Sequence, residues 1–157
     1  MGSKKPIPDK SALDDLHDIN TYWKDGQPNF IDVNDISTIS TTTVFCTFQL
    51  EGTHNWPDCP HDEVAYLRDP HRHMFHFKAY KKVSHADRDV EFIMLKHEIV
   101  NYMTFKYLHH NTNICMFGAQ SCEMLAYEIM KEFELCACEV SEDGENGAFV
   151  QIEKPYH

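Results

Sequence analysis

The chain of 157 residues has the length of one ordinary domain, and its 42% hydrophobic and 25% charged residues are typical of a folded globular protein. Its formal net charge of −11 disfavours binding to nucleic acid or to anionic membrane surfaces, because like charges repel. No apolar run approaches the roughly 18 residues of a transmembrane helix, and no apolar segment follows the N-terminal lysines as in a signal peptide. These features predict a cytoplasmic protein without membrane or nucleic-acid partners.

The cysteines favour the same compartment. An even number of cysteines could form disulfides, but the sequence has no secretory signal and no Cys-x-x-Cys pair. We therefore expect reduced and mostly buried thiols at Cys46, Cys59, Cys115, Cys122, Cys136 and Cys138.

The chain divides into an N-terminal extension, residues 1–41, and a domain formed by residues 42–157. Two strands are predicted at the start of the domain. Thr42–Leu50 is rich in β-branched and aromatic residues, and His71–Val83 alternates between two faces. The connection between these strands is long and contains glycine and proline, which favour turns.

Two helices and two further strands follow. Apolar residues recur at helical spacing between Val90 and Tyr107, and a second helix is predicted from Ser121. Its apolar stripe comprises Cys122, Leu125, Ala126, Ile129, Met130 and Phe133. The strands Leu135–Glu142 and Ala148–Ile152 are separated by a turn with two glycines, which predicts a hairpin.

The order of these elements is strand, strand, helix, helix, strand, strand. It predicts an α+β fold in which a four-stranded antiparallel sheet carries two helices on one face. The edges of such an open sheet are unpaired, so we expect pairing with neighbouring subunits in a homo-oligomer.

Histidines are over-represented, with 11 in the chain. His71 and His73 are two residues apart on a predicted strand, so both imidazoles lie on the same face. His54, just past the end of the preceding strand, is the best candidate for a third ligand. Three neutral imidazoles and an open position are typical of catalytic zinc, although nickel, iron and copper also accept imidazole. The alternative is that these histidines are packed or exposed and bind no metal.

With the histidines located, five motifs in succession resemble the 6-pyruvoyltetrahydropterin synthase family, which includes the 6-carboxytetrahydropterin synthases of queuosine biosynthesis. The resemblance covers about residues 43–152. It rests on a strand ending in histidine, an HxH strand, the opening residues of two helices and a strand ending in glutamate. In this chain these motifs read FQLEGTH at 48–54, PHRHMFHF at 70–77, VEFIMLK at 90–96, SCEMLA at 121–126 and VSE at 140–142.

The resemblance implies a T-fold, in which subunits join their sheets into a barrel, usually a hexamer of two trimers with active sites between subunits. It implies that His54, His71 and His73 hold zinc, and that Glu142 anchors a pterin or purine-like small molecule. A carboxylate facing an N–H and NH₂ pair is a good bidentate match. The implied activity is that of a lyase on dihydroneopterin triphosphate, with His110 handling protons.

Two departures from the family pattern keep a second interpretation open. The family has a catalytic cysteine shortly before its HxH motif, where positions 65–67 of this chain hold Ala, Tyr and Leu. Cys59 is the nearest upstream cysteine, and it reaches the site only if its loop folds back. The aspartate that the family pairs with the histidine matched by His110 is replaced by His109. The alternative is therefore a catalytically impaired protein that binds or sequesters a pterin-, purine- or nucleotide-like molecule.

Overall fold

The computed structural model describes residues 23–24, 27–28 and 41–153. The first two segments are the strands β1 (Trp23–Lys24) and β2 (Gln27–Pro28), which pair antiparallel. The rest of the predicted extension up to residue 40 lies outside the described residues. The division into extension and domain therefore stays a prediction, although the main sheet does begin at Thr42.

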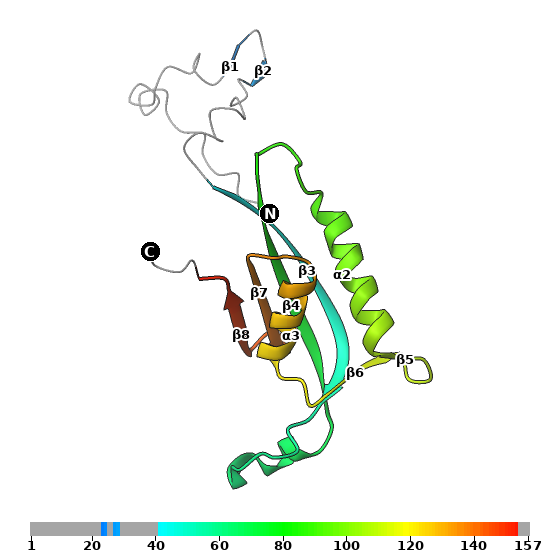
Figure 1. Ribbon diagram of the computed structural model, residues 1–157. Coiled ribbons are helices and arrows are strands. Elements are labelled where there is room, and N and C mark those ends of the chain that lie inside the picture. Colours follow the sequence, from blue (N-terminus) through cyan, green and yellow to red (C-terminus); the bar gives the residue numbers. More distant parts are fainter. Residues whose placement is uncertain (1–22, 25–26, 29–40, 154–157) are drawn as a thin grey trace, which may run out of the picture.

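Within the described residues, six strands form the main sheet in the spatial order β5-β6-β3-β4-β7-β8 (Figure 1). Neighbouring strands are antiparallel except β3 and β6, which run parallel. The predicted α+β class is confirmed, but the prediction of a four-stranded, purely antiparallel sheet is wrong. The strands are β3 (Thr42–His54), β4 (His71–Val83), β5 (Leu108–His109), β6 (Ile114–Gly118), β7 (Ala137–Glu142) and β8 (Asn146–Gln151).

In the main sheet, two strands that the sequence did not predict, β5 and β6, follow the first long helix. β6 has only five residues, of which Cys115 and Phe117 are buried. Periodicity cannot assign so short an apolar run. β6 pairs with the end of β3, and Gly52 permits this close approach. A Cβ at Gly52 would collide with the Phe117 ring, lying 2.8 Å from its Cδ2 atom.

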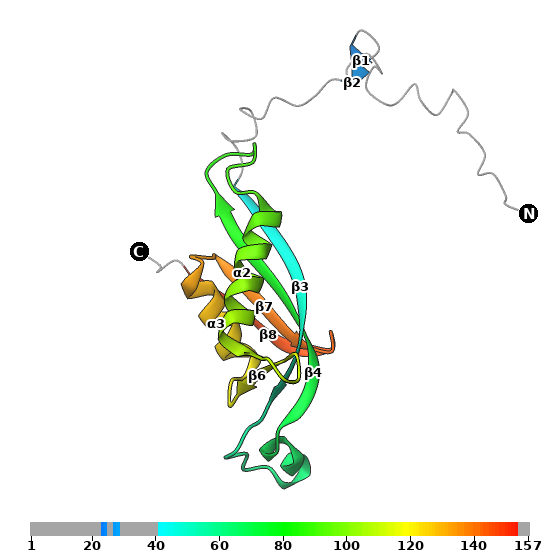
Figure 2. The ribbon, with the colours of Figure 1, turned by 90° about the vertical axis from the view of Figure 1, so that its right-hand side faces the viewer.

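Two helices cover one face of the sheet, as predicted (Figure 2). They are α2 (Phe92–Tyr107) and α3 (Cys122–Glu132). The side chains of Glu91 and Ser121 cap them by accepting the backbone N–H groups of Met94 and Met124. A 3-10 helix, η3 (Asp62–Arg68), lies in the connection between β3 and β4, which projects beyond one end of the sheet (Figure 1).

The core lies between the helices and the sheet and fixes which face of each strand is covered. Phe75, Phe77 and Ala79 of β4 are buried against the helices, as their alternation predicts. Burial of each phenylalanine contributes about 1.5–3 kcal/mol. Because side chains alternate along a strand, His71 and His73 lie on this same face, beyond the last core residue.

The cysteines agree with the expectation of reduced and mostly buried thiols. All six cysteines are free thiols, and all but the half-buried Cys136 are buried. In the part of the chain that the structure describes, no helix combines the length and apolar character that crossing a membrane requires.

Candidate metal site and adjoining cavity

Three histidines meet where the long β3–β4 pair ends. His54 is the antiparallel partner of His71, and Gly52 is the partner of His73. The ring centroids are 4.6 Å apart for His54 and His71, 5.1 Å for His71 and His73, and 5.5 Å for His54 and His73. One ligand atom from each ring lies within 4.8 Å of the others. The cluster that the sequence predicts therefore exists and could hold one metal ion.

Each ring is held from outside through its Nδ1 atom. Nδ1–H of His54 donates to the carbonyl of Gln120 at 3.0 Å, and Nδ1–H of His71 donates to the carbonyl of Asp69 at 2.9 Å. In His73, Nδ1–H donates to a carboxylate oxygen of Asp143 at 2.6 Å. Because carbonyl and ionised carboxylate oxygens only accept, Nδ1 carries the proton in all three rings. The three Nε2 lone pairs are thereby left for an ion.

Two of the Nε2 atoms lack a partner. Nε2 of His54 and Nε2 of His71 are buried and form no hydrogen bond. Burial also lowers the pKa of His54, although its hydrogen bond to Gln120 acts in the opposite direction, so the ring is neutral at neutral pH. Buried polar atoms normally have partners, and a coordinated cation would satisfy both nitrogens. The donor set therefore fits a metal, but imidazole suits zinc, nickel, iron and copper alike.

Glu142, the last residue of β7, reaches the same cluster. Its Oε1 atom lies 3.0 Å from Nε2 of His54, and its Oε2 atom lies 3.5 Å from Nε2 of His73. Because Nδ1 of His54 carries the proton, Nε2 has no hydrogen to donate to Glu142, and the nitrogen forms no hydrogen bond. The Glu142 side chain is 29% exposed, so one side of it faces the histidines while the other remains accessible.

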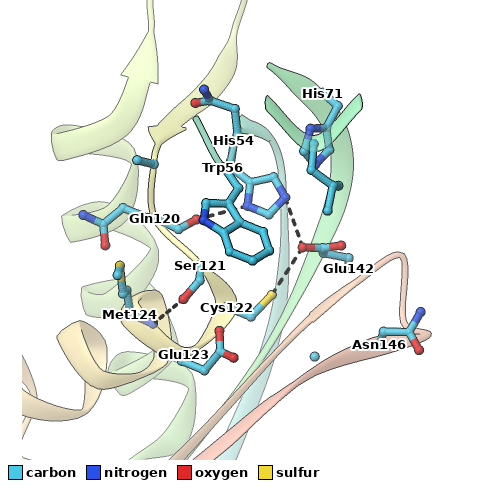
Figure 3. A pocket seen from close by; sticks show the side chains of 14 residues that line it. His54, Trp56, His71, Gln120, Ser121, Cys122, Glu123, Met124, Glu142 and Asn146 are labelled. Atoms are coloured by element: carbon cyan, nitrogen blue, oxygen red, sulfur yellow. Dashed lines mark hydrogen bonds and ion pairs between the residues drawn. The ribbon is translucent and has the colours of Figure 1, made fainter. Parts of the chain in front are cut away.

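A cavity of about 520 Å³ opens beside His54, His71 and Glu142 (Figure 3). That volume is suited to a small organic molecule. The other polar and aromatic side chains that line it include Trp56, Gln120, Ser121, Cys122, Glu123 and Asn146. The N-terminal end of α3 thus forms one wall, the β3–β4 connection contributes Trp56, and the β7–β8 hairpin forms another wall.

Cys122 contacts Glu142 inside this cavity. Its Sγ atom lies 3.8 Å from Oε1 of Glu142, and Figure 3 shows the carboxylate between the thiol and the His54 ring. Burial, reinforced by the charges of Glu142 and Glu123, raises the pKa of Cys122 to about 12. The thiol is therefore protonated at neutral pH and serves as a hydrogen-bond donor.

Cys59 and His110, the residues predicted to transfer protons, do not line this cavity. Cys59 is buried in the β3–β4 connection, where its thiol faces the carbonyls of His61 and Val64 at 3.8 and 3.9 Å. His110 is exposed in the turn between β5 and β6. One chain thus brings Glu142 to the three histidines but brings neither Cys59 nor His110.

Two residues of the site were not predicted as such. Sequence reasoning assigns Cys122 to the apolar stripe of α3 and Asp143 to a turn. Neither position carries a local signal, because their contacts depend on the pairing of β4 with β7 and on the loop that leads into α3.

Comparisons with known proteins assign no family. No family model matches the chain, and no curated protein is significantly similar to it. The resemblance to pterin synthases therefore rests on the five motifs.

Proposed function

We propose that the chain is a zinc-dependent lyase similar to 6-pyruvoyltetrahydropterin and 6-carboxytetrahydropterin synthases, acting on dihydroneopterin triphosphate in a pterin or queuosine pathway. The observation that carries the proposal is the convergence of three imidazoles beside an open cavity, with no hydrogen bond to Nε2 of His54 or of His71. A site built only for stability would have its nitrogens satisfied by the protein.

His54, His71 and His73 would hold the zinc ion. Three neutral histidines with an open position form a common arrangement for catalytic zinc. When bound, zinc would polarise the hydroxyl groups of the substrate side chain. The outward hydrogen bonds of the three Nδ1 atoms keep the rings in the tautomer that such binding requires.

Glu142 would anchor the heterocycle. A carboxylate binds the N–H and NH₂ groups on the pyrimidine edge of a pterin through two charge-assisted hydrogen bonds. Glu142 lines the cavity together with His54 and His71, so a pterin held by its carboxylate would lie beside the metal ligands. Cys122, protonated and in contact with Glu142, would help orient the carboxylate.

Proton transfer requires groups that a single chain does not bring to the cavity. We propose that His110, exposed on its turn, enters the site of a neighbouring protomer in a homo-oligomer, a hexamer of two trimers in the T-fold family. Cys59 is a weaker candidate, because its thiol is buried within its own loop.

A binding protein of the same fold is the second candidate. It is favoured by the position of Cys59 outside the cavity and by the histidine at position 109, where the family has aspartate. Such a protein would retain the pocket and Glu142, and would sequester a pterin-, purine- or nucleotide-like molecule without converting it.

One experiment separates the two candidates. Zinc-loaded full-length protein is incubated with dihydroneopterin triphosphate, products are followed by mass spectrometry, and binding is followed by fluorescence of Trp56, which lines the cavity. Trp56→Phe protein provides the background of the other tryptophan. Turnover that is lost in His71→Ala supports the enzyme, and quenching without turnover supports the binding protein. The absence of both turnover and quenching would contradict both candidates.

A further inference from the structure

Asp143 makes three contacts with the strand that carries His73. Its Oδ2 atom accepts Nδ1–H of His73 at 2.6 Å, and its Oδ1 atom accepts the backbone N–H of Met74 at 2.9 Å. Its own backbone N–H donates to the Met74 carbonyl at 2.8 Å. Both carboxylate oxygens are thus engaged, and the residue is fixed against β4 from the turn between β7 and β8.

The backbone at Asp143 is adapted to this position. Its φ angle is +54°, in the left-handed region that aspartate and asparagine tolerate better than most residues. Gly144 follows with a φ angle of +73°. The turn therefore directs the Asp143 carboxylate toward His73, while the side chain stays 51% exposed.

Asp143 differs from the groups that hold the other two histidines. His54 and His71 are oriented by backbone carbonyls, which no substitution removes. His73 is oriented by a side chain, and that side chain is charged. A carboxylate that accepts from a metal-bound imidazole fixes its orientation and raises its basicity as a ligand.

We propose that Asp143 is a positioning residue for the metal centre, which holds His73 in the orientation and tautomer that direct Nε2 toward the ion. This inference rests on the proposed function, since it assumes that the three histidines bind a metal. Asp143 also links the metal ligands to the cavity, because it directly follows Glu142 in the chain. The position of the Glu142 carboxylate and the orientation of His73 are set by the same turn.

The test compares Asp143→Asn and Asp143→Ala with wild-type protein. Asparagine tolerates the same backbone conformation, but its amide keeps only one of the two oxygens that separately accept from His73 and Met74, so one of these contacts is lost. Alanine removes both acceptors. Glu145→Gln is the matched control, because it removes one negative charge from an exposed residue of the same turn. Zinc affinity of the full-length proteins is measured by competition with a chromophoric chelator.

We expect zinc affinity to fall roughly 10- to 100-fold in Asp143→Ala, to fall less in Asp143→Asn, and to be unchanged in Glu145→Gln. Urea unfolding of the metal-free proteins identifies a merely structural effect. If Asp143→Ala does not fold, Asp143→Asn decides the question. The inference is supported if Asp143→Asn protein folds, binds zinc more weakly and shows a shifted His73 tautomer in nitrogen chemical shifts. Wild-type affinity in the folded Asp143 variants would overturn it, whereas failure of wild-type protein to bind zinc would overturn the proposed function.

Discussion

Glu128 of α3 joins the two helices that cover the sheet, and its removal should destabilise the fold measurably. Its Oε1 atom accepts the Tyr102 hydroxyl at 2.9 Å and the Lys106 ammonium at 2.6 Å, and its Oε2 atom accepts the Tyr107 hydroxyl at 2.6 Å. All three donors come from α2. The cluster therefore fixes α3, whose first turn forms one wall of the cavity.

The expected loss in Glu128→Ala is about 2–3 kcal/mol. A hydrogen bond to a charged group contributes about 1.5–3 kcal/mol, but both tyrosines are only half-buried, so about 1 kcal/mol each is realistic. The Lys106 side chain is 45% exposed, which limits its ion pair to about 0–1 kcal/mol. The higher helix propensity of alanine offsets roughly a few tenths of a kcal/mol of this loss of stability.

Urea unfolding of the metal-free protein at neutral pH measures this loss, with Glu132→Ala as the control for removing a carboxylate from an exposed position of the same helix. Burial alone would raise the pKa of Glu128, but the hydrogen bonds from Lys106, Tyr107 and Tyr102 hold it below its ordinary value of 4.5. The contribution is thus present above pH 4.5 and should be lost as the pH falls through the folded pKa. A loss no larger than that of Glu132→Ala would refute the reasoning.

Three shorter predictions concern the site and its supports. Glu142→Gln should weaken pterin binding about tenfold or more, because an amide matches only one of two donors; unchanged affinity in a Trp56 fluorescence titration would contradict the role of Glu142. Burial holds the pKa of His54 below 6.5, so the unfolded chain binds more protons and metal-free protein should lose stability as the pH falls below that value. Urea unfolding should show a weaker pH dependence in His54→Asn, and equal dependence would count against the burial argument. Gly52→Ala should cost about 1–3 kcal/mol, since the new methyl group meets the buried Phe117 ring; chemical denaturation near wild-type stability would be incompatible with the close β3–β6 approach.

The elements with a clear period were predictable from the sequence, and those without one were not. The alternation in His71–Val83 and the stripe of α3 each imply a single buried face, and the structure buries those faces. β6 was missed because five apolar residues fit a strand or a buried helical segment equally well. Its parallel pairing with β3 depends on a crossover through α2, which local sequence does not specify.

The turn between β7 and β8 was also predicted only in part. The sequence identifies the hairpin by its two glycines, but it does not specify which residues of the turn adopt positive φ. The structure places positive φ at Asp143 and Gly144, because Glu142 pairs with Asn146 and the turn is confined to residues 143–145. This register brings Asp143 to His73, a contact between residues 70 positions apart.

The histidine cluster was predictable because it follows from two local facts. His71 and His73 share a face by strand alternation, and His54 ends the strand that pairs with theirs. The groups that complete the site could not be found in this way. Cys122 and Asp143 enter through long-range pairing, and His110 is exposed in its turn and does not line the cavity of its own chain.

Metal content tests the three-histidine centre most directly. Wild-type, His71→Ala and His73→Ala proteins are dialysed against zinc, desalted and analysed for metal, with His76→Ala as the control because His76 lies on the opposite face of β4. We predict one zinc ion per chain in the wild type and in His76→Ala, and its loss in both other variants. A wild-type protein that retains no zinc, or variants of His71 and His73 that retain it fully, would contradict a metal centre at this site.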